Sequence, residues 1–263
     1  MSEPAVLIVG AGATGLPVGY HLRLAGAELT FLVRPGRKPA VEFPQRLYCY
    51  DDASLRTLDG YDVVEDAAEL AGRSFNFVLI TLDGHTARTE QGTAMLRGLG
   101  DAIRDSDAIV IMCGFGVGVR EHHLRELGIA DDRLLHGFLG MLSHQSSAEL
   151  PVHPPTDPAR IAESTACYRH SPGKLGFRLE SGNPAAAKRF AELYNSSGES
   201  RCTLMSRPMD DIFSKVAFPV YGACELMGWA DFATVAKNKE LWRLACDAQR
   251  EILTLPQHGW GAG

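Results

Sequence analysis

The residues from Ala5 to Arg37 constrain the fold of this chain more than any other stretch. An apolar run at 6–9 leads into the hexapeptide Gly-Ala-Gly-Ala-Thr-Gly at 10–15. A helical pattern then continues to Ala25, and a second apolar run occupies 29–33. This order of strand, glycine turn, helix and strand predicts one βαβ unit.

Each glycine of the turn has a steric role in a dinucleotide site. Gly10 permits a tight turn off the strand, Gly12 lets a pyrophosphate approach the backbone, and Gly15 lets the helix pack close to the strand. The positive end of the helix and its first N–H groups then face the phosphates. We therefore predict a cofactor-binding turn, with a glycine-tolerant turn that binds no ligand as the alternative. Its residues are Gly10, Gly12, Ala13, Thr14 and Gly15.

The end of the second strand indicates which dinucleotide binds. NAD sites carry Asp or Glu at this point, whereas this chain has Arg34, followed by Arg37 and Lys38. A guanidinium group can hold a 2′-phosphate through two parallel hydrogen bonds. Because the whole chain has a net charge of −6, the local cluster of cations predicts NADP as the cofactor rather than NAD. The alternative is a solvated basic loop.

The amino-acid composition limits the class of protein to which the chain can belong. The chain has 263 residues, of which 45% are apolar and 22% charged, as in ordinary globular proteins of one large or two small domains. The negative charge argues against a general nucleic-acid or membrane-surface role. No apolar run reaches the roughly 20 residues that span a bilayer. The six cysteines form no Cys-x-x-Cys pair, so we expect no metal site and a cytoplasmic protein with free thiols.

Strands alternate with helical patterns in the first part of the chain. Continuous apolar runs predict buried strands at 75–82 and 107–112, and helical spacing follows each of them, at 86–103 and 119–127. This alternation predicts an α/β fold with a doubly wound parallel sheet, which binds ligands at the carboxyl ends of its strands. The loops expected around one crevice begin at Gly10, Arg34, Leu82 and Cys113.

The rest of the chain predicts a second domain of helices only. Before the boundary we expect strands at 134–139, 164–168 and 201–204, an edge strand at 175–179, and a helix at 184–194 that is capped by Asn183. After it we expect two helices, at 208–227 and 236–253. The predicted domains are 1–206, which binds NADP, and 207–263.

The chain resembles the ketopantoate reductase family (2-dehydropantoate 2-reductases) over nearly its whole length. Besides the glycine turn and Arg34, the resemblance rests on Thr81-Leu82, the glycine turn at Gly114, the stretches 140–144 and 170–173, and Asp211 to Lys215. Such enzymes have a Rossmann-type domain followed by a helical domain, and they transfer hydride from NADPH to a 2-keto acid. The resemblance implies that Lys215 is the general acid. The cofactor contacts expected beyond the first turn are Arg34, Thr81, Leu82, Cys113 and Gly114.

Several positions differ from the family's pattern. Asp83 stands where the family has lysine, Cys113 where it has asparagine, and Pro219 and Ala223 where asparagines hold the substrate. The chain also ends before further helices of the family. We expect Asp83, Cys113 and Pro219 to line the substrate side, for a 2-keto acid or a related carbonyl. The alternative function is a non-catalytic NADP-binding protein that has lost its substrate site.

Local chemistry adds expectations for three of these positions. Apolar neighbours at 216–218 would desolvate Lys215, which lowers its pKa and eases proton donation. The alternative is a surface lysine at the domain boundary. Pro219 cannot donate a hydrogen bond to the Lys215 carbonyl, so a helix kink is expected there. Cys113 is either a reactive thiol or a small residue that lines the nicotinamide pocket. His122 and His123 are expected to be solvated side chains of a helix.

The helical segment carries more large apolar side chains than two helices can enclose. They include Phe218, Leu226, Trp229, Trp242 and Leu244. We expect a homodimer through the C-terminal helices, in a two-fold contact that pairs the same surface of both chains. Packing of these helices on the first domain is the alternative.

Overall fold

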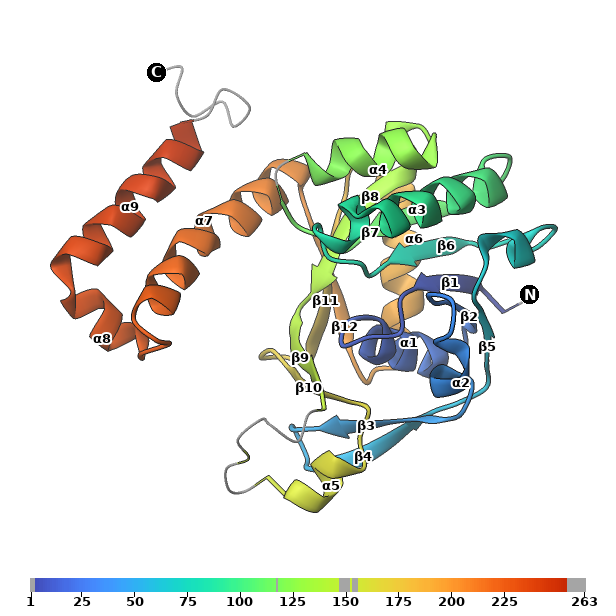
Figure 1. Cartoon of the computed structure of the whole chain (residues 1–263), viewed down its shortest axis with the longest axis horizontal. Coiled ribbons are helices and arrows are strands. Elements are labelled where there is room, and N and C mark those ends of the chain that lie inside the picture. Colours follow the sequence, from blue (N-terminus) through green and yellow to red (C-terminus); the bar gives the residue numbers. More distant parts are fainter. Residues whose placement is uncertain (1–2, 117, 147–151, 153–155, 255–263) are drawn as a thin grey trace. The chain divides into compact units, whose positions relative to one another are not determined.

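The computed structural model describes residues 3–116, 118–146, 152 and 156–254, and for 207–216 it describes the backbone alone. The chain divides into two compact units, Met1–Leu204 and Met205–Gly263. The first unit is built from two β-sheets and their covering helices, and the second is helical (Figure 1).

An eight-stranded sheet forms the centre of the α/β part. In spatial order its strands are β12 (Arg201–Met205), β11 (Leu175–Glu180), β8 (Leu134–Leu139), β7 (Ile109–Met112), β6 (Phe77–Ile80), β1 (Ala5–Val9), β2 (Glu28–Leu32) and β5 (Tyr61–Val64). The six strands from β8 to β5 are parallel, and β11 runs antiparallel to β8. Numbered along the chain, the parallel strands have the order 3-2-1-4-5-6, which is the doubly wound Rossmann arrangement. The predicted fold class is confirmed.

Helices cover both faces of this sheet. The helices α1 (Gly15–Leu24) and α6 (Pro184–Asn195) lie on one face, and α3 (Glu90–Ile103) and α4 (Val119–Leu127) lie on the other (Figure 1). Successive strand residues point to opposite faces, so Ile8 packs with the first pair of helices and Leu7 with the second. Both are fully buried, and each contributes roughly 1.5–3 kcal/mol to stability.

A smaller sheet packs against the α1 side. Its order is β4 (Ser54–Leu58), β3 (Gln45–Cys49), β10 (Ala166–His170) and β9 (Met141–Gln145). The hairpin β3–β4 is inserted between β2 and β5, after the short helix α2 (Lys38–Val41). Another short helix, α5 (Pro158–Ala162), precedes β10. The sequence predicted part of β10 but neither β4, β5 nor β9.

The helical unit contains α7 (Arg207–Leu226), α8 (Phe232–Lys237) and α9 (Lys239–Thr254). The single helix expected at 236–253 is therefore two, because Asn238 interrupts it and accepts a hydrogen bond from the Leu241 N–H at 3.2 Å. The buried core of the helical unit is small and consists of Ala223, Cys224, Val235 and Ala245. Within the described ranges, no helix has the length and apolar character needed to cross a bilayer.

Three other expectations need correction. The strand β11 is not an edge strand, since β12 and β8 flank it. The helix expected at 86–103 begins only at Glu90, because the Thr89 hydroxyl caps it and a short 3-10 helix, η2 (Thr86–Arg88), precedes it. His122 and His123 are buried rather than solvated, and their ring nitrogens bond the carbonyls of Ala87 and Val119 at 2.9 and 2.8 Å. Two further 3-10 helices are η1 (Ala67–Leu70) and η3 (Asp131–Arg133).

Candidate functional site

Four loops leave the large sheet along one edge. The last residues of the parallel strands lie side by side in register: Leu32, Val9, Ile80 and Met112. Backbone hydrogen bonds continue this alignment by one residue. The N–H groups of Gly10, Thr81 and Cys113 donate to the carbonyls of Leu32 (2.9 Å), Val9 (3.0 Å) and Ile80 (2.8 Å), respectively. The loops that start at 10, 33, 81 and 113 therefore meet at the carboxyl edge, where doubly wound sheets bind ligands.

The fold requires glycine at some positions of the first loop and not at others. Gly10 has a φ of +99°, and an added Cβ would lie 2.8 Å from Thr81 Oγ1. At Gly15 a Cβ would lie 2.0 Å from the Gly10 carbonyl oxygen, which no side chain tolerates. At Gly12, among the described residues, a Cβ would meet only Gln145 Nε2, at an ordinary contact distance of 3.5 Å. The fold therefore explains Gly10 and Gly15 but not Gly12.

The glycine turn is held in place from the neighbouring strand. The Thr81 hydroxyl donates hydrogen bonds to the carbonyls of Val9 (2.8 Å) and Gly10 (3.2 Å). Ala13 and Thr14 are partly exposed at the start of α1. In the described part of the chain, the Thr14 hydroxyl caps none of the first N–H groups of this helix. The Gly15 N–H is consequently available to an anion, whereas the Leu16 N–H donates to the Gly12 carbonyl at 3.0 Å.

The basic loop after β2 forms a tight turn. Pro35 and Gly36 occupy its centre, Gly36 has a φ of +80°, and the Arg37 N–H donates to the Arg34 carbonyl at 3.1 Å. These are the features of a type II turn, which brings its first and fourth residues close together. Both arginines are exposed, and neither forms an ion pair with any residue that the structure describes. Two cations thus stand beside the glycine turn.

In the third loop, the Asp83 carboxylate is hydrogen-bonded to residues of the same loop. Asp83 is exposed, and its carboxylate accepts hydrogen bonds from the N–H groups of His85 (2.9 Å) and Thr86 (2.7 Å) and from the Thr86 hydroxyl (2.7 Å). The bonds from Thr86 lower the pKa of Asp83 below its usual value. Asp83 therefore stays ionised and organises the turn before η2, next to the partly exposed Leu82.

The fourth loop packs closely on the third. An added Cβ at Gly114 would lie 2.8 Å from the Leu82 carbonyl oxygen, and one at Gly84 would lie 2.3 Å from that of Phe115. Cys113 begins this loop, and burial raises the pKa of its thiol to about 12. The thiol is protonated at neutral pH, which disfavours the reactive-thiol interpretation and leaves that of a small lining residue.

Two expected site residues lie in the helical unit. Lys215 and Pro219 are four residues apart in α7. The side chain of Lys215 lies outside the described residues, so its role stays a prediction. Pro219 is partly buried, and Ala223, one turn further, is buried in the small helical core.

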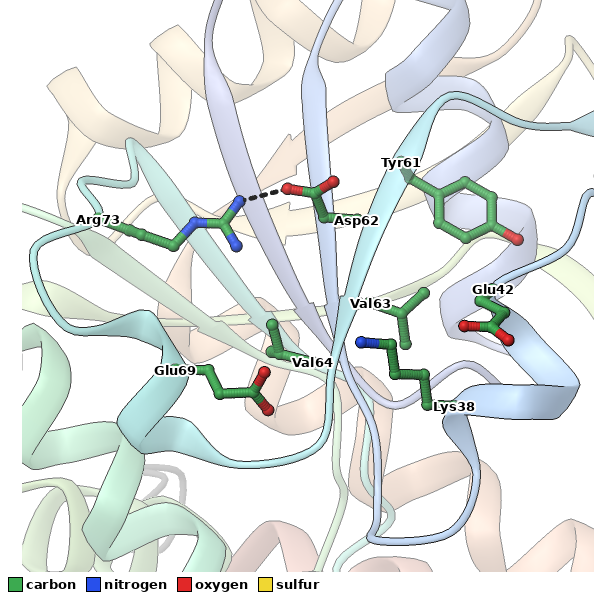
Figure 2. Close-up of a pocket in the computed structure, with 8 residues that line it drawn as sticks. All are labelled: Lys38, Glu42, Tyr61, Asp62, Val63, Val64, Glu69 and Arg73. Carbon is green, nitrogen blue, oxygen red and sulfur yellow. Dashed lines mark hydrogen bonds and ion pairs between the residues drawn. The ribbon is translucent and has the colours of Figure 1, made fainter.

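Two hollows lie near the ends of these strands. One, of about 240 Å³, adjoins Ala11 of the glycine turn and is lined by Arg37 and by Gln145 of β9. The other, of about 350 Å³, follows the outer strand β5, where Lys38 and Glu42 lie on one side and Glu69 and Arg73 on the other (Figure 2). The sequence did not predict Gln145 as a site residue. The only signal was its place directly after the 140–144 stretch.

Comparison with known proteins gives similarity in structure only. No protein-family model matches the chain, and no curated protein matches it in sequence. A 2-dehydropantoate 2-reductase from Methylococcus capsulatus superposes with a TM-score of 0.70 at 15% identity, over 97% of this chain and 74% of the other. The enzyme of that name from Geobacter metallireducens gives 0.64 at 17%, over 95% and 74%. A D-mandelate dehydrogenase in complex with NADH gives 0.64 at 14%, over 95% and 72%.

These similarities extend over nearly the whole chain, including its helical unit. At such low identities they establish the fold and leave the chemistry open. The resemblance predicted from the sequence motifs is therefore confirmed at the level of the fold. The chain has the fold of the ketopantoate reductases, a Rossmann-type sheet followed by a helical unit.

Proposed function

We propose that the chain is an NADP-dependent oxidoreductase that reduces a 2-keto acid or a related carbonyl by hydride transfer from NADPH. The observation that most supports binding of the cofactor is the glycine at position 12. Nothing in the described structure requires glycine there, since a Cβ would make only one ordinary contact. A bound pyrophosphate does require it, because the phosphates must approach the backbone at the second glycine of the turn.

The preference for NADP rests on the basic turn after β2. Arg34 and Arg37 are exposed cations at the point where the ribose 2′-position of a bound dinucleotide lies. No acid of the turn competes for them, and a 2′-phosphate offers the oxygens that guanidinium groups bind best. We expect NADPH to bind more tightly than NADH by a factor of at least roughly ten.

The proposed chemistry combines the cofactor with a lysine. The bound cofactor supplies hydride to the carbonyl carbon, and the Lys215 ammonium donates a proton to the carbonyl oxygen. Thr81, Leu82, Cys113 and Gly114 belong to the loops that would line the nicotinamide end. The substrate class draws support from a structural neighbour, a D-mandelate dehydrogenase bound to NADH and anilino(oxo)acetate, which carries a carbonyl beside a carboxylate.

A second candidate is a binding protein without catalysis. Two positions expected on the substrate side favour it, because the Asp83 carboxylate is engaged within its own loop and the Cys113 thiol stays protonated. Neither presents a group poised for a substrate. This protein would bind NADPH as tightly as the reductase but would turn over no carbonyl.

One experiment separates the two candidates. Calorimetric titration with NADPH and NADH measures cofactor binding and preference. NADPH oxidation is then followed with a panel of 2-keto acids of increasing side-chain size, and product formation is checked by mass spectrometry. Turnover supports the reductase. Tight NADPH binding without turnover on any of these acids supports the binding protein, and the absence of binding refutes both.

We also propose that the protein is a homodimer that associates through its helical unit. Among the described residues of this unit, seven large apolar side chains are exposed: Phe218, Tyr221, Leu226, Trp229, Phe232, Trp242 and Leu244. Large apolar side chains that gather on the surface of a protein mark an interaction site. A two-fold contact would pair the same residues of both chains and cover them in one step.

A further inference from the structure

The hollow of about 240 Å³ beside the glycine turn is electrostatically suited to an anion. Among the described residues that line it, Arg37 is the one that is charged, and the others are apolar side chains, amides and hydroxyls. The hollow along β5 differs, because three acids and two cations line it (Figure 2). An anion would therefore meet net attraction only in the first hollow, which Ala11 connects to the glycine turn.

Three side chains of this hollow can donate hydrogen bonds to a ligand. Arg37, Gln145 and Thr165 are exposed and, among the described residues, their side chains have no hydrogen-bond partner. The two serines in the lining are different. The hydroxyls of Ser146 and Ser164 both donate to the Ile161 carbonyl, at 2.7 and 2.8 Å, so their protons are already used.

The small sheet holds two of these donors in position. Gln145 pairs with Ala166 in the antiparallel ladder of β9 and β10, and the Ser146 N–H donates to the Thr165 carbonyl at 3.1 Å. Gln145 and Thr165 are thus neighbours on adjacent strand ends. The side chain of Gln145 reaches the glycine turn, where its Nε2 lies 3.5 Å from a Cβ placed on Gly12.

A histidine fixes the backbone at Gln145. His144 Nδ1 lies 2.9 Å from the Gln145 carbonyl oxygen, so it carries the proton and donates it. His144 Nε2 is then the acceptor and receives the hydroxyl proton of Tyr50 at 3.1 Å. This bond joins β9 to the residue after β3. The backbone that carries the Gln145 side chain is therefore held before a ligand arrives, which lowers the entropy lost on binding.

We propose that this hollow receives the 2′-phosphate of NADP and that Arg37, Gln145 and Thr165 bind it. The assignment rests on the proposed function and goes beyond it, because it places two phosphate ligands on the small sheet. The ribose of a dinucleotide crosses the first glycine turn, and its 2′-position faces the end of β2. From there the hollow beside Ala11 is the adjacent space. Arg37 supplies the charge, whereas Arg34 lies outside the lining.

The test compares two nucleotides that differ only in the 2′-phosphate. Adenosine 2′,5′-bisphosphate and adenosine 5′-monophosphate are titrated into the full chain by calorimetry. We expect Arg37→Ala to lower the affinity for the bisphosphate by roughly 10- to 100-fold, and Gln145→Ala and Thr165→Val to lower it by roughly 3- to 10-fold each. The affinity for the monophosphate should stay within about twofold.

Controls separate this inference from the proposed function. Gln91→Ala on α3 and Arg46→Ala on β3 remove an exposed amide and an exposed guanidinium outside the hollow, and neither should change the preference. Gln145→Glu places a carboxylate in the hollow and should abolish the preference, while thermal unfolding verifies that the variant is folded. If the intact chain prefers the bisphosphate and only Arg34→Ala removes that preference, the hollow is not the site. If the intact chain binds neither nucleotide, the proposed function itself fails.

Discussion

The imidazole rings of His21 and His170 lie against each other with their centroids 5.0 Å apart, although one belongs to α1 and the other to the small sheet. His170 is fully engaged, since its Nδ1 lies 2.6 Å from Asp51 Oδ2 and its Nε2 lies 3.1 Å from Ser200 Oγ. His21 is 1% exposed, and within the described ranges neither of its ring nitrogens has a hydrogen-bond partner. A buried histidine of this kind is held neutral by the fold.

The first prediction is a loss of stability in mild acid that His21 causes. Burial, and then the charge on His170, lower the pKa of His21 from its usual 6.5 to about 3. Between these values the unfolded chain binds more protons than the folded one. The stabilisation is therefore complete above pH 6.5 and is lost as the pH falls toward 3. At pH 4.5 this group alone should cost about 2.5 kcal/mol.

Urea unfolding at pH 7 and pH 4.5 measures this effect. His21→Leu should retain most of that 2.5 kcal/mol at the lower pH, because nothing is left there to protonate. His85→Leu is the matched control, since His85 is exposed. Carboxylates titrate equally in all three proteins and cancel from the comparison. If His21→Leu loses as much stability on acidification as the intact chain, the neutral buried histidine is not the cause.

The second prediction distinguishes the glycines of the first turn. Gly12→Ala should change the free energy of unfolding by less than about 1 kcal/mol, because the added Cβ meets only Gln145 Nε2 at 3.5 Å. It should nevertheless weaken NADPH binding by at least roughly tenfold, since the methyl group occupies the path of the pyrophosphate. Gly15→Ala should destabilise the fold by roughly 1–3 kcal/mol or more, because its Cβ clashes with the Gly10 carbonyl. Unchanged NADPH affinity in folded Gly12→Ala would remove the main support for the cofactor site.

The turn around Gly12 also marks where prediction from the sequence succeeds. Strand, turn and helix occupy the continuous segment from Ala5 to Leu24, and local steric rules determine their arrangement. The small sheet could not be predicted, because its strands are short and mixed in character and pair across long separations, such as Tyr48 with Cys167. For the same reason Gln145 was missed, since its contact with Gly12 depends on that sheet. The sequence predicted Arg34 as the cofactor contact. Only the folded turn shows that Arg37, and not Arg34, lines the hollow beside Ala11.

The third prediction concerns the reactivity of Cys113. With a pKa of about 12, roughly one thiol in 10,000 is ionised at pH 8, so alkylation should be slow. Iodoacetamide labelling followed by peptide mass spectrometry should modify Cys246 on α9 before Cys113, because both side chains are partly exposed but the Cys113 thiol stays protonated. Both cysteines should react at similar rates in denaturant. Rapid labelling of Cys113 in the folded protein would restore the reactive-thiol interpretation.

The fourth prediction tests the proposed general acid. Lys215→Ala should lower turnover by roughly 100- to 10,000-fold, the usual contribution of a positioned acid. The affinity for NADPH should change by less than about twofold, because the ammonium group would act only in the transition state. Lys237→Ala, at the end of α8 in the same unit, is the matched control and should be fully active. If Lys215→Ala keeps full turnover on a substrate of the intact protein, the lysine has a structural role.

The last prediction concerns assembly. Leu226 and Trp229 are 74% and 64% exposed at the end of α7 and just beyond it, and each large apolar side chain left in water forgoes roughly 1.5–3 kcal/mol. Light scattering at micromolar concentration should therefore give the mass of two chains. Leu226→Asp should shift the equilibrium toward monomers, since a two-fold contact buries the new charge twice. Leu24→Asp on α1, where Leu24 is 44% exposed, should leave the mass unchanged. If light scattering gives the mass of one chain at every concentration, the dimer is refuted.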